Sequence, residues 1–168
     1  VRNAGNIIPP YSGNPCGEAA SIEYAVNVLE VEQVVVCGHA CCGAIAHLVE
    51  RHGYPYDERL PMVSKWLRHA DAARTLTEAH WDELGDGERV RYAIEANVTM
   101  QLKHLETHPS VACAVERGKL RLHGWVYDLE TGGIRHAVGP NRRFEPLCPT
   151  LREVVLSPAS EPRVLAVR

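Results

Sequence analysis

The chain has 168 residues, of which 45% are hydrophobic and 23% are charged, a composition typical of a globular domain with a real core. Its 18 basic and 21 acidic residues give a formal net charge of −3, so there is no positive field to attract nucleic acid or anionic lipid. The apolar runs are far shorter than the ~20 residues that span a bilayer. We therefore expect neither a nucleic-acid partner nor a membrane segment.

The first residues, Val-Arg-Asn-Ala-Gly-Asn, lack the charged start, apolar middle and small-residue cleavage site of a signal peptide. The sequence starts without a methionine. We expect a further segment upstream of Val1.

Three of the six cysteines, Cys37, Cys41 and Cys42, cluster around His39. Disulfide scaffolds spread their cysteines through small loop-rich chains, so this spacing favours a metal site or reactive thiols in a reducing compartment. It predicts a cytoplasmic location. Cys37 and Cys113 lie inside apolar stretches and are expected to be small buried hydrophobes.

The first half of the chain predicts a helix, a strand and a second helix. Residues 17–30 carry apolar side chains at helical spacing. Residues 33–37 form a β-branched run without polar alternation, typical of a strand covered on both faces. Gly38 is expected to end this strand, and residues 42–51 to form the next helix.

Three more helices are predicted at residues 62–76, 88–105 and 110–117. The long middle one carries a stripe of side chains expected to face the core, and its members are Val90, Ala93, Ile94, Asn97, Val98, Gln101 and Leu102. Residues 119–138 then predict a β-hairpin, because an alternating run precedes a Thr-Gly-Gly turn.

From Gly139 onward, prolines interrupt any long element. The sequence therefore predicts one domain over residues 1–138 and a proline-rich tail over residues 139–168. The tail should pack on the surface or on a partner subunit.

Helix, buried strand, glycine and helix in this order predict an α/β fold with a mostly parallel sheet flanked by helices. Ligands of such sheets bind beyond the carboxyl ends of the strands, where His39 and Cys42 fall. A histidine and a cysteine three residues apart can direct nitrogen and sulfur to one zinc ion. By itself this spacing also fits a packed histidine beside an inert thiol. Gly43 would let the backbone approach a ligand closely.

Four segments in order and register resemble the signatures of the β-class carbonic anhydrases. They are Val-Arg-Asn-Ala-Gly-Asn at 1–6, Ser-Ile-Glu-Tyr-Ala-Val at 21–26, Val-Cys-Gly-His-x-x-Cys-Gly-Ala at 36–44, and His-Gly-Trp-x-Tyr-Asp at 123–128. The resemblance covers residues 1–138 and fades in the tail. Four signatures together are far more specific than one.

The resemblance implies a zinc enzyme, a lyase that interconverts carbon dioxide and bicarbonate, with one zinc per subunit held by two cysteines, one histidine and a water molecule. His39 and Cys42 match the second and third protein ligands, and Cys41 falls at a variable position. Gly43, Tyr24 and Ala4 match positions that bind or surround the substrate. The resemblance also implies a homodimer or higher homo-oligomer, with helix faces such as that of residues 17–30 shared between subunits.

The chain departs from the family pattern in one respect. The Cys-x-Asp-Ser-Arg motif, which carries the first zinc cysteine and a catalytic aspartate–arginine pair, does not occur in it, so no catalytic residue is assigned within these residues. The chain is then part of a longer enzyme, a shortened relative without activity, or a protein in which Cys16 or Cys41 replaces the missing ligand.

Two other functions stay open from the sequence. The same fold could hydrolyse carbon disulfide or carbonyl sulfide, because pocket shape alone would separate these substrates. The chain could also be a non-catalytic zinc or thiol protein that binds a partner.

Overall fold

The computed structural model describes residues 1–49, 59–139, 142–147 and 164–167. In chain order the elements are η1 (Ala4–Asn6), α1 (Gly17–Asn27), β1 (Gln33–His39), α2 (Gly43–Val49), α3 (Pro61–Leu67), η2 (Arg68–Ala70), α4 (Asp71–Ala79), α5 (Asp86–Glu106), α6 (Pro109–Glu116), β2 (Arg121–Tyr127), β3 (Ile134–Val138), β4 (Arg143–Pro146) and β5 (Val164–Val167).

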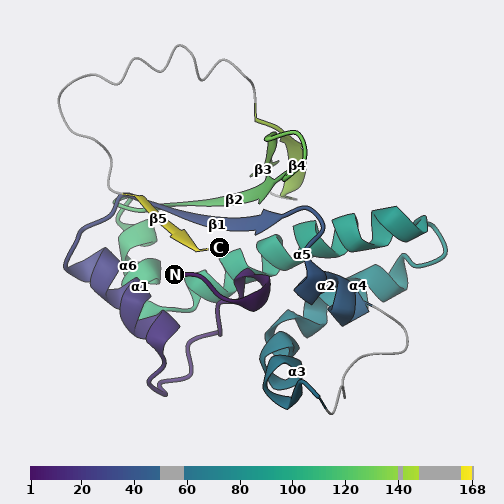
Figure 1. Cartoon of the computed structure of the whole chain (residues 1–168). Helices are drawn as coiled ribbons and strands as arrows, with labels where there is room; N and C mark the ends of the chain where they lie inside the picture. Colours follow the sequence, from purple (N-terminus) through teal and green to yellow (C-terminus); the bar gives the residue numbers. More distant parts are fainter. Residues whose placement is uncertain (50–58, 140–141, 148–163, 168) are drawn as a thin grey trace.

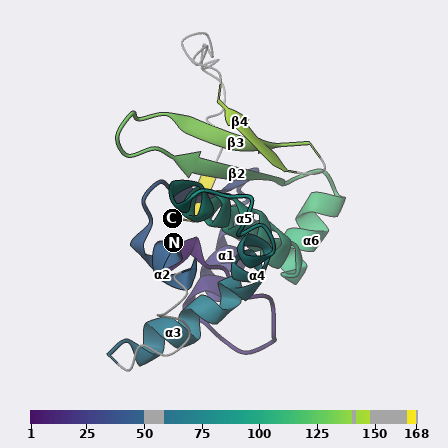
Figure 2. The same ribbon diagram turned by 90° about the vertical axis from the view of Figure 1, so that its right-hand side faces the viewer.

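The strands form one mixed sheet in the order β4-β3-β2-β1-β5. β1 pairs in parallel with β2 and with β5, whereas β3 is antiparallel to both β2 and β4. The α/β fold and the predicted hairpin are therefore confirmed. The helices lie on one side of strands β2 to β4, as Figures 1 and 2 show.

β1 is longer than predicted, because Gly38 does not end it. Gly38 pairs with Val126 and His39 with Tyr127, so the parallel ladder continues to the end of β2. The glycine serves packing instead: a Cβ atom on Gly38 would lie 2.9 Å from Cγ2 of Val98 on α5. The absence of a side chain lets helix and strand approach closely.

The prediction of one continuous helix over residues 62–76 is wrong. It is divided into α3 and α4 by the 3₁₀ turn η2. Leu67, Ala70 and Ala73 are all fully buried, and their spacing of three residues matches the three residues per turn of a 3₁₀ helix. The tighter turn keeps all three side chains on the buried side.

α5 is the central helix, and its predicted core stripe is confirmed. Six of the seven predicted positions are buried: Ala93, Ile94, Asn97, Val98, Gln101 and Leu102. The helix begins earlier than predicted, at Asp86, because the Glu88 carboxylate accepts a 3.2 Å hydrogen bond from the Gly85 amide and caps the first turn.

Two short strands of the proline-rich tail join the sheet, which the sequence did not predict. β4 extends the hairpin edge and β5 pairs with β1 at the opposite edge. Phe144 of β4 is buried in the core. The division at residue 138 stays a prediction, and Arg51, the expected end of the second helix, lies outside the described residues.

Two further expectations concern side-chain burial and membrane spans. Cys113 is exposed and Cys37 is half-buried, so the prediction that both are buried hydrophobes is wrong. α6 turns Cys113 toward the surface, since Val111 is the residue that α6 buries. Among the described residues, no helix has the length and apolarity to cross a bilayer.

Candidate metal centre

His39 is the last residue of β1, at the carboxyl edge of the parallel part of the sheet. Its side chain is exposed, and its Nδ1 atom lies 2.9 Å from the carbonyl oxygen of Ala40. A carbonyl oxygen only accepts hydrogen bonds, so in the neutral ring Nδ1 carries the proton and Nε2 keeps a free lone pair. This is the orientation in which a histidine ligates a metal while its other nitrogen is held by the protein.

Cys42 follows after a tight turn. Ala40 donates a 2.8 Å backbone hydrogen bond to Tyr127, and Cys41 takes a left-handed conformation with φ 55°. The turn leads directly into α2, where the Cys42 carbonyl accepts the Ala46 amide at 2.9 Å. Cys42 is 5% exposed and Cys41 is exposed. The turn therefore separates a buried thiol from a surface thiol.

The donor chemistry of His39 and Cys42 fits zinc, which binds imidazole nitrogen and thiolate sulfur. A protein zinc centre needs at least three protein ligands. In the part of the chain that the structure describes, three or more His, Cys, Asp or Glu side chains do not gather as a metal-binding group. Neither Cys16 nor Cys41 therefore completes a set with this pair. The sulfur of Cys16 instead accepts the Ala19 amide at the start of α1.

Ala4 and Gly43 lie on elements that meet at this edge. η1, which contains Ala4, contacts both β1 and α2. The carbonyl oxygen of Ala4 accepts a 2.9 Å hydrogen bond from Nε1 of Trp66. Gly43 is exposed, and open space surrounds the position of a Cβ atom there. The assignment of both residues to a substrate pocket stays a prediction.

Tyr24 lies elsewhere. It belongs to α1, which Figure 1 places on the opposite side of the molecule from α2. Its side chain is 56% exposed. Within one chain the structure does not bring Tyr24 to His39, so its predicted role at the substrate stays untested and would require a second copy.

His123 lies on β2, an interior strand of the sheet, and its register partner on the neighbouring strand β1 is Val35. Burial lowers the pKa of His123, and the positive neighbours Arg121 and His136 lower it further. Its Nε2 atom is buried and has no hydrogen-bond partner among the described residues. The sheet therefore favours a neutral ring here.

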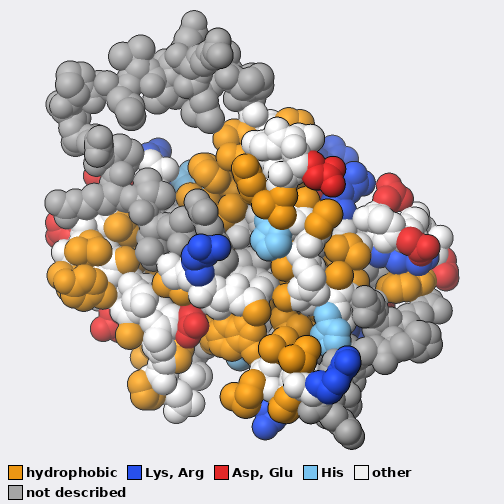
Figure 3. Space-filling view, in the orientation of Figure 1, with side chains coloured by type: hydrophobic (Ala, Val, Ile, Leu, Met, Phe, Trp, Pro, Cys, Tyr) orange, Lys and Arg blue, Asp and Glu red, His pale blue; other side chains and the backbone are white. Residues whose placement is uncertain are grey.

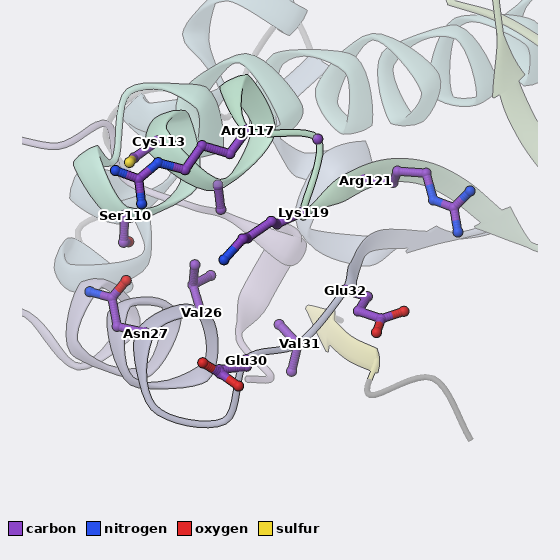
Figure 4. A pocket seen from close by; sticks show the side chains of 12 residues that line it. Val26, Asn27, Glu30, Val31, Glu32, Ser110, Cys113, Arg117, Lys119 and Arg121 are labelled. Carbon is purple, nitrogen blue, oxygen red and sulfur yellow. The ribbon is translucent and has the colours of Figure 1, made fainter. Parts of the chain in front are cut away.

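A pocket of about 590 Å³ lies away from the candidate metal centre, between α1, α6 and the start of β2. Charged side chains of both signs line it, among them Glu30, Arg117 and Lys119, and Figure 4 shows Lys119 reaching across it. None of the residues predicted for the metal or the substrate lines this pocket.

The fold is that of an α/β protein with His39 at the end of a central parallel strand and Cys42 in the turn that follows it. The sequence model of the family described as carbonic anhydrase matches residues 1–134. The chain therefore belongs to the carbonic anhydrase family.

Individual relatives agree. The chain is 46% identical over 156 residues to a carbonic anhydrase of Pseudomonas aeruginosa, covering 92% of this chain and 69% of that protein. It is 43% identical over 169 residues to carbonic anhydrase 1 of Escherichia coli O157:H7, covering 99% and 69% respectively. The matched region is thus about seven tenths of each relative.

Solved structures place the chain in the β class. It superimposes on the β-carbonic anhydrase CcaA with a TM-score of 0.81 at 39% identity, covering 88% of this chain and 70% of that one. A tetrameric β-carbonic anhydrase of Sordaria macrospora matches with a TM-score of 0.69 at 29% identity, covering 81% and 66%.

The structure also shows that two buried residues of α5 form hydrogen bonds with the segment around η1, a role that the sequence did not predict for them. Asn97 and Gln101 were expected only as members of a core stripe. Two amides within an apolar stripe are a signal in themselves, because buried amides require specific hydrogen-bond partners.

Proposed function

We propose that the protein containing this chain catalyses the zinc-dependent, reversible hydration of carbon dioxide to bicarbonate and a proton. The observation that carries the proposal is the Nδ1 contact between His39 and the Ala40 carbonyl, which leaves Nε2 available to a metal; Cys42, three residues further on, is a buried thiol. Membership of the carbonic anhydrase family supports the reaction.

The chain's own residues would hold and orient the metal. His39 would bind it through Nε2 and Cys42 through its sulfur, and the Ala40 carbonyl would fix the imidazole ring. When bound, zinc lowers the pKa of water from 15.7 to about 7 and so supplies a nucleophile for carbon dioxide at neutral pH. Ala4 and Gly43 would form a wall without charged groups, which suits a small apolar substrate.

The test uses the protein expressed from its complete reading frame. We expect metal analysis to find about one zinc per chain and a stopped-flow indicator assay to detect carbon dioxide hydration. His39→Ala should lose both, because it removes the only nitrogen donor of the pair. Zinc without hydration would favour a non-catalytic zinc relative, and a wild-type protein that binds no zinc would overturn the proposal. Carbon disulfide and carbonyl sulfide serve as comparison substrates.

We also infer that the protein is a homodimer or a higher homo-oligomer. Three large side chains near the end of α1 are exposed: Tyr24 at 56%, Val28 at 58% and Leu29 at 44%. Hydrophobic side chains gather over α1 in Figure 3. Covering them with a second subunit would remove this surface from water. Light scattering tests this inference, and a stable, active monomer would contradict it.

A cytoplasmic location remains part of the proposal. It is supported by Cys16, Cys41, Cys42 and Cys113, which are free thiols in the part of the chain that the structure describes. Free thiols are typical of a reducing compartment. Fractionation of the producing cells would test the location.

A further inference from the structure

α5 carries two fully buried amide side chains one helical turn apart. Asn97 and Gln101 are both 0% exposed, and Gln101 Nε2 donates a 2.9 Å hydrogen bond to Asn97 Oδ1. A buried amide costs free energy unless its donors and acceptors are paired. The remaining polar atoms of this pair therefore need partners from elsewhere in the fold.

The shortest of these contacts are with the N-terminal segment; Gln101 also contacts the His69 carbonyl at 3.3 Å and His104 Nδ1 at 3.2 Å. Asn97 Nδ2 donates a 2.8 Å hydrogen bond to the carbonyl oxygen of Gly5. The Ile8 amide donates a 2.7 Å hydrogen bond to Gln101 Oε1. Because a carbonyl only accepts and a backbone amide only donates, these contacts fix which way round each side-chain amide must lie.

The segment held in this way has an unusual backbone. Gly5 and Asn6 in η1 have positive φ values of 77° and 46°. Glycine adopts this region freely, whereas it is uncommon for a residue with a Cβ atom such as Asn6. The Asn97 and Gln101 hydrogen bonds fall on either side of this turn, at Gly5 and at Ile8.

η1 also contacts β1, which ends at His39, and α2, which begins directly after Cys42. Asn6 Oδ1 lies 3.6 Å from the position of a Cβ atom on Gly38, the residue before His39. A Cβ atom on Gly5 would lie 3.5 Å from Cδ1 of Ile45, in the helix that Cys42 precedes. A shift of η1 would therefore displace the residues packed against it at the end of β1 and in α2.

We propose that Asn97 and Gln101 are positioning residues for the metal centre: they fix η1, and η1 fixes the spacing between the β1 end with His39 and the α2 start with Cys42. This inference rests on the proposed function, because it takes His39 and Cys42 as zinc ligands. Neither amide touches the metal or the substrate.

The test compares Asn97→Ala and Gln101→Met with a matched control in the protein from the complete reading frame. Gln101→Met conserves volume and removes the side chain's hydrogen-bond contacts with Ile8, Asn97, His69 and His104, so it serves if Asn97→Ala fails to fold. The control is Thr77→Val, because Thr77 is also 0% exposed and its hydroxyl donates a 2.8 Å hydrogen bond to the Ala73 carbonyl within α4 and not to η1.

Three measurements are made on each variant. We expect hydrogen exchange of the Ile8 amide to quicken about tenfold in both amide variants, and zinc affinity in a chelator competition to fall about tenfold. The visible absorption bands of the Co²⁺-substituted protein should shift, since they report ligand geometry. Thr77→Val should change none of the three.

The outcomes separate the two proposals. Faster exchange with unchanged zinc affinity and unchanged Co²⁺ bands would overturn the positioning role, as would equal effects in Thr77→Val. If the expected changes occur in a protein that binds zinc but does not hydrate carbon dioxide, the positioning role stands and the proposed reaction fails. A wild-type protein without zinc affinity would overturn both.

Discussion

Trp66 and Ala4, 62 positions apart in the sequence, are joined by a 2.9 Å hydrogen bond from the indole Nε1 to the carbonyl oxygen. The contact ties α3 to the turn that borders β1 and α2. Together with the amides of α5, it holds η1 from a second direction.

Trp66→Phe should loosen this turn while keeping an aromatic ring in place. It removes one hydrogen bond to a partly exposed group, for which we expect a loss of about 0.5–1.5 kcal/mol in the free energy of unfolding. Urea denaturation measures the loss, and hydrogen exchange at Gly5 should quicken. Unchanged stability together with unchanged exchange would show that the contact contributes nothing to the turn.

Cys42→Ser should abolish stoichiometric zinc binding, because an alcohol is a much weaker zinc ligand than a thiolate. Cys41→Ser is the matched control: the neighbouring Cys41 is exposed whereas Cys42 is buried, so this variant should keep its zinc. Metal analysis after gel filtration measures both. Zinc loss in Cys41→Ser with retention in Cys42→Ser would reverse the assignment.

His104→Asn should weaken the pH dependence of stability. Burial lowers the pKa of His104 below its ordinary 6.5, helped by the charges of His69 and His108 and opposed by the hydrogen bond to the Ile8 carbonyl. The unfolded chain therefore takes up the proton first as the pH falls. Stability from this group is complete above about pH 6.5 and is lost as the pH falls from there toward the lowered native pKa.

The side-chain amide of an asparagine at position 104 can still donate a hydrogen bond to the Ile8 carbonyl, but it does not titrate. Urea denaturation at several values between pH 5 and 8 should therefore show a shallower slope for the variant below pH 6.5. The slope should not vanish, because the pKa of His123 is lowered as well, mainly by burial, and acts with the same sign. An unchanged slope would contradict the prediction for His104.

Gly38→Ala should destabilise the fold by about 1–3 kcal/mol through overpacking. The new methyl group would lie 2.9 Å from Cγ2 of Val98 and 3.3 Å from Cγ2 of Ile94. Val98→Ala opens space at that point, so the double variant should lose less stability than the sum of the two single losses. A double-mutant cycle by chemical denaturation measures the coupling, and strict additivity would show that the clash does not form.

The family and the α/β fold were predictable from the sequence, because they are encoded in local patterns; the assignment of His39 and Cys42 as zinc ligands stays a prediction. A β-branched run before Gly-His-x-x-Cys indicates a buried strand that ends in potential ligands, and apolar spacing predicted the buried stripe of α5. These features depend on neighbours within a few residues, so the order of the residues is sufficient to find them.

The tertiary structure decided what depends on distant partners. Pairing with β2 carried β1 through Gly38 to His39, and the burial of Leu67, Ala70 and Ala73 broke a predicted helix into two. The hydrogen bonds of Asn97 with Gly5 and of Gln101 with Ile8 form only because the fold packs α5 against a segment more than 90 positions away. A hydrogen bond between residues so far apart in the chain leaves no periodic trace in the sequence, because its partner is chosen by the packing of the whole fold.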